Sequence, residues 1–162
     1  MVFTGTFQRS LDGKARFLLP KRVRAELSES NLLFLTPGTD HCLELHTDES
    51  LHTLAERANQ SAAGSQNIKS FSRLFYAQAE QCGIDAQGRI RIPKSLTSYA
   101  GLEKDIYIVG VGFNWEIWDV ANWRSYLQTH EDEFDQVARS TFDHAVAIVQ
   151  PTIITSELSA TD

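Results

Sequence analysis

The feature that most constrains the fold is a phrase that the chain contains twice, as "LDGKARFLLPK" and as "IDAQGRIRIPK". Both stretches read apolar residue, Asp, three residues, Arg, apolar residue, any residue, apolar residue, Pro, Lys. They begin at Leu11 and Ile84, an offset of 84 − 11 = 73 residues. A repeat at this spacing indicates that one supersecondary unit is used twice.

The similarity between the two copies continues beyond this phrase. Pro20 and Pro93 each precede a short helical pattern, and proline suits the first helical turn because it has no amide hydrogen to leave unpaired. Two apolar runs around a turn follow in each copy, "LLFLTPGTDHCLEL" and "DIYIVGVGFNWEIW", which predict hairpins. A longer helix then closes each copy, capped by Thr47 or Asp48 in the first and by Asp119 in the second.

The number of strands decides the fold class. One copy offers only three to four expected strands, too few to form a stable sheet with both faces covered. Two copies can close one shared barrel, each covering edges that the other would leave bare. We therefore expect a mainly β fold with helices, of the α+β class, in which two tandem repeats form a barrel flanked by helices.

Four segments follow from the pattern. Residues 1–60 form the first repeat, residues 61–80 a linker beginning "SAAGSQN" with a connecting helix, and residues 81–128 the second repeat. Residues 129–162 form an acidic C-terminal helix followed by a tail.

Charge is distributed unevenly along the chain. The net charge is −6, yet residues 1–25 carry 6 − 1 = +5, so the other 137 residues sum to −11. The cations of this basic end are Arg9, Lys14, Arg16, Lys21, Arg22 and Arg24, against the single acid Asp12. A localised basic end on an acidic body produces an oriented field, which favours a polyanion as partner.

The Asp-x-x-x-Arg spacing predicts a tight turn, because an aspartate accepts hydrogen bonds from the backbone amides that follow it. We assign a structural role to Asp12, Pro20, Asp85, Gly88, Arg89 and Pro93. Gly88 can adopt the positive φ that such a turn requires, whereas Ala15 stands at that place in the first copy and predicts a strained or differently shaped turn. Arg89 is expected to pair with its own aspartate or to cap a barrel end.

Strand parity points Phe17 and Leu19 into the core and Arg16 away from it. We expect the cations of the loop, the preceding strand and the following helix to converge with Arg16 on one surface. Such groups contact phosphates, and an arginine at a loop tip can reach a guanine edge. The predicted DNA-contacting residues are Lys14, Arg16, Arg9, Lys21, Arg22 and Arg24. The alternative is a solvated basic face without a partner.

No other pattern in the sequence predicts a metal, catalytic or cofactor site. His41 and His46 flank Cys42, but a separation of five places them on opposite faces of a strand, so no metal site is predicted. Cys42 and Cys82 form no CxxC pair and are expected to be buried small hydrophobes. Nucleophile-elbow and glycine-rich phosphate-loop motifs are missing from the sequence, which predicts neither an enzyme nor a cofactor. Without an 18-residue apolar run or a signal peptide, the chain is expected to be cytoplasmic and to contact no membrane.

From Met1 to about Gln128 the chain resembles the MraZ family of bacterial regulators, which have two tandem AbrB/SpoVT-type domains. The similarity lies in both repeated phrases, in "SRLFYAQAEQCGIDAQGRIRIP" and in "YAGLEKDIYIVGVGFNWEIWD". It implies a swapped-hairpin barrel of the double-psi type and a closed homo-oligomeric ring. Lys14 and Arg16 would lie on the face that contacts DNA. The family usually has Lys-Gly-Arg at this loop, whereas this chain has Lys14-Ala15-Arg16.

Two functional hypotheses remain. The first is a sequence-specific DNA-binding transcriptional regulator, associated with the nucleoid. The resemblance implies that it acts on direct repeats in the promoter of a division and cell-wall gene cluster, including its own gene. The second is a ring-forming structural or protein-interaction scaffold without specific DNA binding. A salt titration separates them, because only phosphate contacts predict a steep loss of DNA affinity with rising salt.

Overall fold

The computed structural model describes residues 2–27, 32–61 and 66–149. It divides the chain into two compact units, Met1–Arg124 and Ser125–Asp162. Part of the expected linker, residues 62–65, and the whole tail from Pro151, with Ile153 and Ile154, lie outside the described residues.

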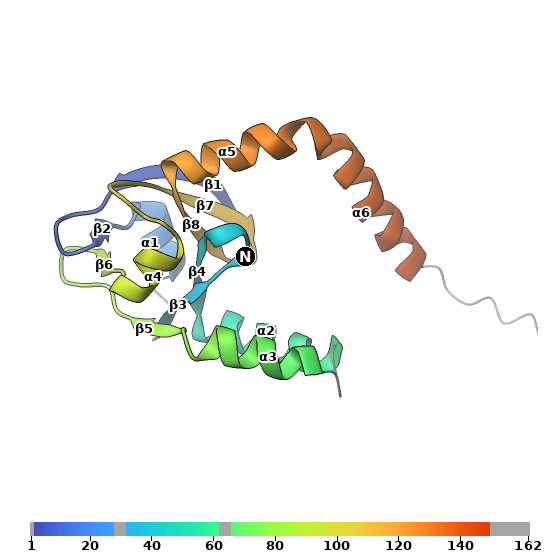
Figure 1. Cartoon of the computed structure of the whole chain (residues 1–162), viewed down its shortest axis with the longest axis horizontal. Helices are drawn as coiled ribbons and strands as arrows, with labels where there is room; N and C mark the ends of the chain where they lie inside the picture. Colours follow the sequence, from blue (N-terminus) through green and yellow to red (C-terminus); the bar gives the residue numbers. More distant parts are fainter. Residues whose placement is uncertain (1, 28–31, 62–65, 150–162) are drawn as a thin grey trace, which may run out of the picture. The chain divides into compact units, whose positions relative to one another are not determined.

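The first unit contains eight described strands and most of the helices (Figure 1). The strands are β1 (Phe3–Ser10), β2 (Arg16–Leu18), β3 (Leu33–Pro37), β4 (Leu43–Thr47), β5 (Glu80–Cys82), β6 (Arg89–Arg91), β7 (Asp105–Gly112) and β8 (Trp115–Asp119). The helices of this unit are α1 (Lys21–Leu27), α2 (Asp48–Ser61), α3 (Gln66–Tyr76), α4 (Lys94–Tyr99) and the start of α5 (Val120–His130). A 3-10 turn, η1 (Thr39–His41), joins β3 to β4, so His41 lies in a turn and not on a strand as the sequence had suggested.

The strands of the two copies are exchanged. Six of them form an antiparallel sheet in the order β1-β7-β8-β4-β3-β5, and β2 pairs with β6 in a separate two-stranded ribbon. The first strand of each copy pairs with the hairpin of the other, β1 with β7 and β5 with β3. This confirms the α+β class and the swapped arrangement of two repeats, because neither copy completes its sheet alone.

The core lies on one face of the large sheet and beneath the ribbon. It is formed by alternate strand residues and by apolar residues of α1 and α4, among them Phe17, Val23, Leu27, Leu35, Leu45, Ile90, Leu96, Ile108, Trp115 and Ile117. Phe17 and Ile90 face each other across the ribbon and are 1% and 0% exposed. Burial of these two side chains fixes the ribbon, and the alternation of strand residues then directs its remaining side chains outward.

The expected helix boundaries are confirmed. The amide of Arg24 donates to the carbonyl of Pro20 (2.9 Å), and that of Thr97 donates to Pro93 (3.0 Å), so each helix begins beside its proline. The hydroxyl of Thr47 accepts the amide of Ser50 (3.1 Å) and caps α2. Asp119 accepts the amide of Ala121 (2.9 Å) and caps α5.

The second unit continues α5 and adds η2 (Glu131–Glu133) and α6 (Phe134–Val149). Phe134, Val137 and Phe142 of α6 are all exposed within the structure. Among the described residues no helix has the length and hydrophobicity needed to cross a membrane.

Candidate nucleic-acid interface

The turn between β1 and β2, which we call the first turn (Asp12–Arg16), is organised by one carboxylate. Asp12 Oδ1 accepts the amides of Lys14 (2.9 Å) and Arg16 (3.0 Å), and Oδ2 accepts Nε of the Arg16 guanidinium (2.8 Å). The amide of Asp12 in turn donates to the carbonyl of Arg16 (2.9 Å), which closes the turn. The Asp-x-x-x-Arg spacing therefore fixes the direction of the arginine as well as the path of the backbone.

The second turn (Asp85–Arg89), between β5 and β6, has the same frame. Asp85 Oδ1 accepts the amides of Gln87 (2.9 Å) and Arg89 (3.0 Å), and Oδ2 accepts Nε of Arg89 (2.9 Å). The Arg89 guanidinium also bonds the side chain of Gln87. The expected pairing of Arg89 with its own aspartate is present in the structure.

The pKa of the aspartate is lowered in both turns. Hydrogen bonding from the backbone amide of Arg16, supplemented by the Lys14 amide and the Arg16 guanidinium, holds the pKa of Asp12 below its usual value. The amide of Arg89 does the same for the pKa of Asp85. Both carboxylates are therefore ionised at neutral pH and keep their arginines in place.

The turns differ at the residue before each arginine. Gly88 has φ +79°, which glycine adopts without a steric penalty, whereas Ala15 adopts φ +54° at the corresponding position. The first turn therefore keeps the shape of the second and carries the strain of a left-handed alanine, about 1 kcal/mol. Strain was one of the two outcomes that the alanine predicted, and a differently shaped turn was the other.

The strand exchange decides which helix lies beside each turn. The amide of Ile92 donates to the carbonyl of Ala15 (2.9 Å), and the amide of Leu19 donates to the carbonyl of Gly88 (3.0 Å). The first turn consequently borders the start of α4 from the second copy, and the second turn borders the start of α1. Helix α1, which follows the first turn in the sequence, begins beside the other turn.

The structure distributes the six cations of the basic end over three places. Lys14 and Arg16 lie on the first turn, where Lys14 is exposed and the Arg16 side chain is 29% exposed. Arg9 reaches from β1 to the ribbon, where its Nε donates to the carbonyl of Leu18 (3.0 Å). The residues of α1 are placed differently.

Helix α1 holds Lys21, Arg22 and Arg24. Arg22 forms an ion pair with Glu26 (2.9 Å) and also donates to the hydroxyl of Thr4 (2.9 Å). The Arg24 guanidinium lies directly over Gly88 on the second turn, and Lys21 is exposed at the start of the helix. Arg24 therefore lies against the second turn and not beside Lys14 on the first, as the order of residues along the chain had suggested. Arg22 is held against β1 and within its own helix.

Two cations that the sequence did not single out border the first turn. Arg91 is directly opposite Arg16 in the ribbon register and is exposed, and Lys94 is the exposed first residue of α4. In the described part of the chain, neither side chain forms an ion pair or a hydrogen bond with another residue. The signal that could have revealed them was the repeat itself, since strand exchange between copies brings β6 beside β2.

The juxtaposition of Arg16 and Arg91 indicates an anionic partner. Side chains directly opposite on one face of an antiparallel pair have Cβ atoms about 5 Å apart, and like charges at that separation repel. Asp12 offsets one of the charges through Nε of Arg16, whereas no acid among the described residues pairs with Arg91. Together with Lys14, these residues form a cationic surface that a phosphate backbone would neutralise.

Comparison with known proteins shows which family shares this architecture. The model of the family described as "MraZ protein, putative antitoxin-like" matches residues 2–71 and 75–145, and so extends beyond Gln128, where the resemblance had been expected to end. A protein of Kocuria rhizophila named "Transcriptional regulator MraZ" is 40% identical over 135 residues, which cover 83% of this chain and 93% of the relative. Proteins of the same name from Acetivibrio thermocellus and Pediococcus pentosaceus are 39% and 37% identical, covering 77% and 88% of this chain and 86% and 98% of the relatives. The chain belongs to the MraZ family.

Proposed function

We propose that this protein is a sequence-specific DNA-binding transcriptional regulator that contacts DNA through the first turn and the outer face of the β2–β6 ribbon. The observation that carries the proposal is the cross-strand pair Arg16 and Arg91 beside the exposed Lys14. The name of the relatives, "Transcriptional regulator MraZ", supports the same function.

The geometry of the first turn supports a role for Arg16 in reading bases. Its Nε is held by Asp12, so the two terminal nitrogens of the guanidinium remain for a ligand. A forked guanidinium bonds O6 and N7 of guanine in the major groove, which is wide enough for a two-stranded ribbon. Arg16 would therefore specify sequence, while Lys14, Arg91 and Lys94 contact phosphates and set the register of the ribbon on the duplex.

One chain offers few contacts, so we further propose that copies assemble into a closed ring. Copies related by rotation present the same turn in the same direction, which suits direct repeats in DNA better than a palindrome. Linking several weak sites raises the overall affinity without any new kind of contact. The target we propose is a set of direct repeats in the promoter of a division and cell-wall gene cluster that includes the protein's own gene, which would place the protein at the nucleoid.

An electrophoretic shift assay with the protein's own upstream DNA tests this function. We expect binding whose logarithmic affinity falls linearly with the logarithm of salt concentration, by about 0.9 for each phosphate contact. Direct repeats should bind more tightly than the same half-sites inverted, and native mass spectrometry should show the assembly in both free and bound states. Absence of binding at low salt would instead support a scaffold without specific DNA binding.

A further inference from the structure

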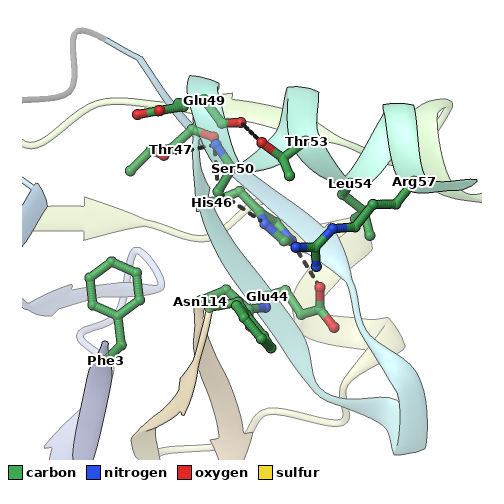
Figure 2. Close-up of a pocket in the computed structure, with 11 residues that line it drawn as sticks. Phe3, Glu44, His46, Thr47, Glu49, Ser50, Thr53, Leu54, Arg57 and Asn114 are labelled. Atoms are coloured by element: carbon green, nitrogen blue, oxygen red, sulfur yellow. Dashed lines mark hydrogen bonds and ion pairs between the residues drawn. The ribbon is translucent and has the colours of Figure 1, made fainter. Parts of the chain in front are cut away.

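A second candidate site lies away from the ribbon, in a pocket of about 410 Å³ between β4, the first turns of α2 and the tip of the β7–β8 hairpin (Figure 2). Its wall contains a line of three polar side chains that are near one another in the sequence. Glu44 and His46 are two residues apart on β4 and therefore share one face of that strand. Ser50 is the third residue of α2, the helix that follows β4. The DNA-binding function uses none of these residues.

Hydrogen-bonding contacts join the three side chains in the order Glu44, His46, Ser50. Nε2 of His46 lies 2.8 Å from Oε2 of Glu44, and Nδ1 of the same ring lies 3.4 Å from Oγ of Ser50. Figure 2 shows the imidazole between the carboxylate and the hydroxyl. The ring is 4% exposed and packs edge-on against Phe75, so its orientation is fixed.

The order of these contacts determines where protons reside. A carboxylate only accepts hydrogen bonds, so a neutral His46 carries its proton on Nε2 and leaves the lone pair of Nδ1 directed at Ser50. The Ser50 hydroxyl has one proton and two acceptors within reach, Nδ1 of His46 and the carbonyl of Thr47 (3.1 Å). Rotation of that hydroxyl toward Nδ1 gives the nucleophile, base and orienting carboxylate of a serine acyl-transfer site. The long Ser50–His46 distance is typical of such sites without substrate.

The remaining pocket wall suits a small substrate with an apolar part. Phe3, Leu54 and Phe113 supply apolar surface. The Arg57 guanidinium lies 5.5 Å from the centre of the Phe113 ring, and the side chain of Asn114, 9% exposed, also lines the pocket. These two groups are donors that could stabilise negative charge developing on a carbonyl oxygen.

We propose that Ser50 is a nucleophile that accepts acyl groups from small esters or thioesters, with His46 as its general base and Glu44 as a positioning residue. The Ser50 oxygen forms a bond to the carbonyl carbon, and the hydroxyl proton passes to Nδ1 of His46. The bond from that carbon to the leaving oxygen or sulfur then breaks, and the leaving group takes the proton from His46. The product is an O-acylated Ser50 and a free alcohol or thiol.

A fluorescent fluorophosphonate is the probe for this site, because it reacts with activated serines with loss of fluoride. We expect the full-length protein to be labelled at Ser50, as located by peptide mass spectrometry. Ser50→Ala should abolish labelling. His46→Gln should slow it about 100-fold, the lower end of the effect of a general base.

Two further variants separate catalysis from a structural role. Glu44→Gln preserves the shape of the side chain and should slow labelling about 10-fold with an unchanged melting temperature, while Glu44→Asp restores part of the rate because it restores the charge. The matched control is Ser95→Ala, since Ser95 also lies in the first turn of a helix but has no hydrogen bond to an imidazole. This variant should be labelled like the wild type. An unlabelled Ser50 in the wild type, or equal labelling rates in the wild type and Glu44→Gln, would overturn the proposal whatever the DNA assays show.

Discussion

The two turns of this molecule have one backbone frame and different side chains. In each, an aspartate accepts two amides and the Nε of an arginine four residues later, with distances that agree within 0.1 Å. Lys14 of the first turn corresponds to Gln87 of the second, and Ala15 corresponds to Gly88. The frame therefore serves folding in both places, whereas only the first turn carries the cation at position 14 to which we assign DNA contact.

The neighbours of the turns strengthen the contrast. Arg16 is opposite Arg91 in the ribbon, but Arg89 is opposite the apolar Leu18. The second turn is instead covered by the guanidinium of Arg24. The comparison teaches that a duplicated motif can keep one backbone frame in both copies while the side chains and neighbours around it diverge.

The largest expected effect is a difference in DNA binding between variants of Arg16 and Arg89. Arg16→Ala should abolish specific DNA binding, because each lost guanine contact costs about 1–3 kcal/mol and the loss is repeated in every protomer of a ring. Arg89→Ala should retain specific binding. Gel-shift titrations with both variants, together with native mass spectrometry to show an intact oligomer, check this. Equal losses in the two variants would remove the functional difference between the turns.

A stability effect follows for the glycine of the second turn. Gly88→Ala places a Cβ at φ +79° and against the Arg24 guanidinium, so both the backbone and a neighbour must adjust. We expect a loss of about 2 kcal/mol and a fall in melting temperature of roughly 4–8 °C, measured by thermal unfolding. An unchanged melting temperature would show that the second turn tolerates alanine as the first does.

A variant of Arg91 tests the contrast between the first and second turns with a smaller expected effect. Arg91→Leu installs the side chain that the first copy has at the equivalent position, Leu18, so the ribbon should fold normally. Loss of one phosphate contact per bound protomer should reduce the salt slope by about 0.9 for each such protomer and weaken specific and non-specific DNA alike. Fluorescence anisotropy at several salt concentrations measures both quantities. An unchanged slope would exclude Arg91 from the interface.

The smallest effect is expected for the alanine of the first turn. Ala15→Gly relieves the left-handed strain at φ +54° but increases the conformational entropy of the unfolded chain. These contributions nearly cancel, so urea unfolding should show a change within about 0.5 kcal/mol. A change as large as that of Gly88→Ala would mean that the alanine strains the first turn far more than its φ suggests.

Much of the fold could be predicted from the sequence because the determining interactions are local. Pro20 and Pro93 indicated the helix starts, Thr47 and Asp119 the caps, and the alternation around Phe17 and Ile90 the buried face of the ribbon. The repeat predicted that the two copies contribute strands to one shared structure, since one copy could not complete a sheet. Each of these inferences depends on residues that are close together in the chain or on the repeat offset.

The site was predicted less completely because its neighbours are distant in sequence. The motif led to Lys14 and Arg16 as candidates, but Arg91 and Lys94 border the first turn only because β6 lies beside β2. The helix cations were assigned to the first turn by their order in the chain, and the exchange places Arg24 on the second turn instead. The contacts from Glu44 through His46 to Ser50 were not predicted, because they depend on how helix α2 is oriented relative to strand β4.

A photo-crosslinking experiment tests the central claim most directly. Benzoylphenylalanine is placed at Lys14 in one variant and at the equivalent Gln87 in another, both exposed positions on turns of the same shape. Each variant is irradiated with the protein's own upstream DNA. The account predicts a DNA crosslink from position 14 that is lost at high salt, and little or none from position 87. Crosslinks of equal yield from both positions, or a crosslink from position 87 alone, would contradict it.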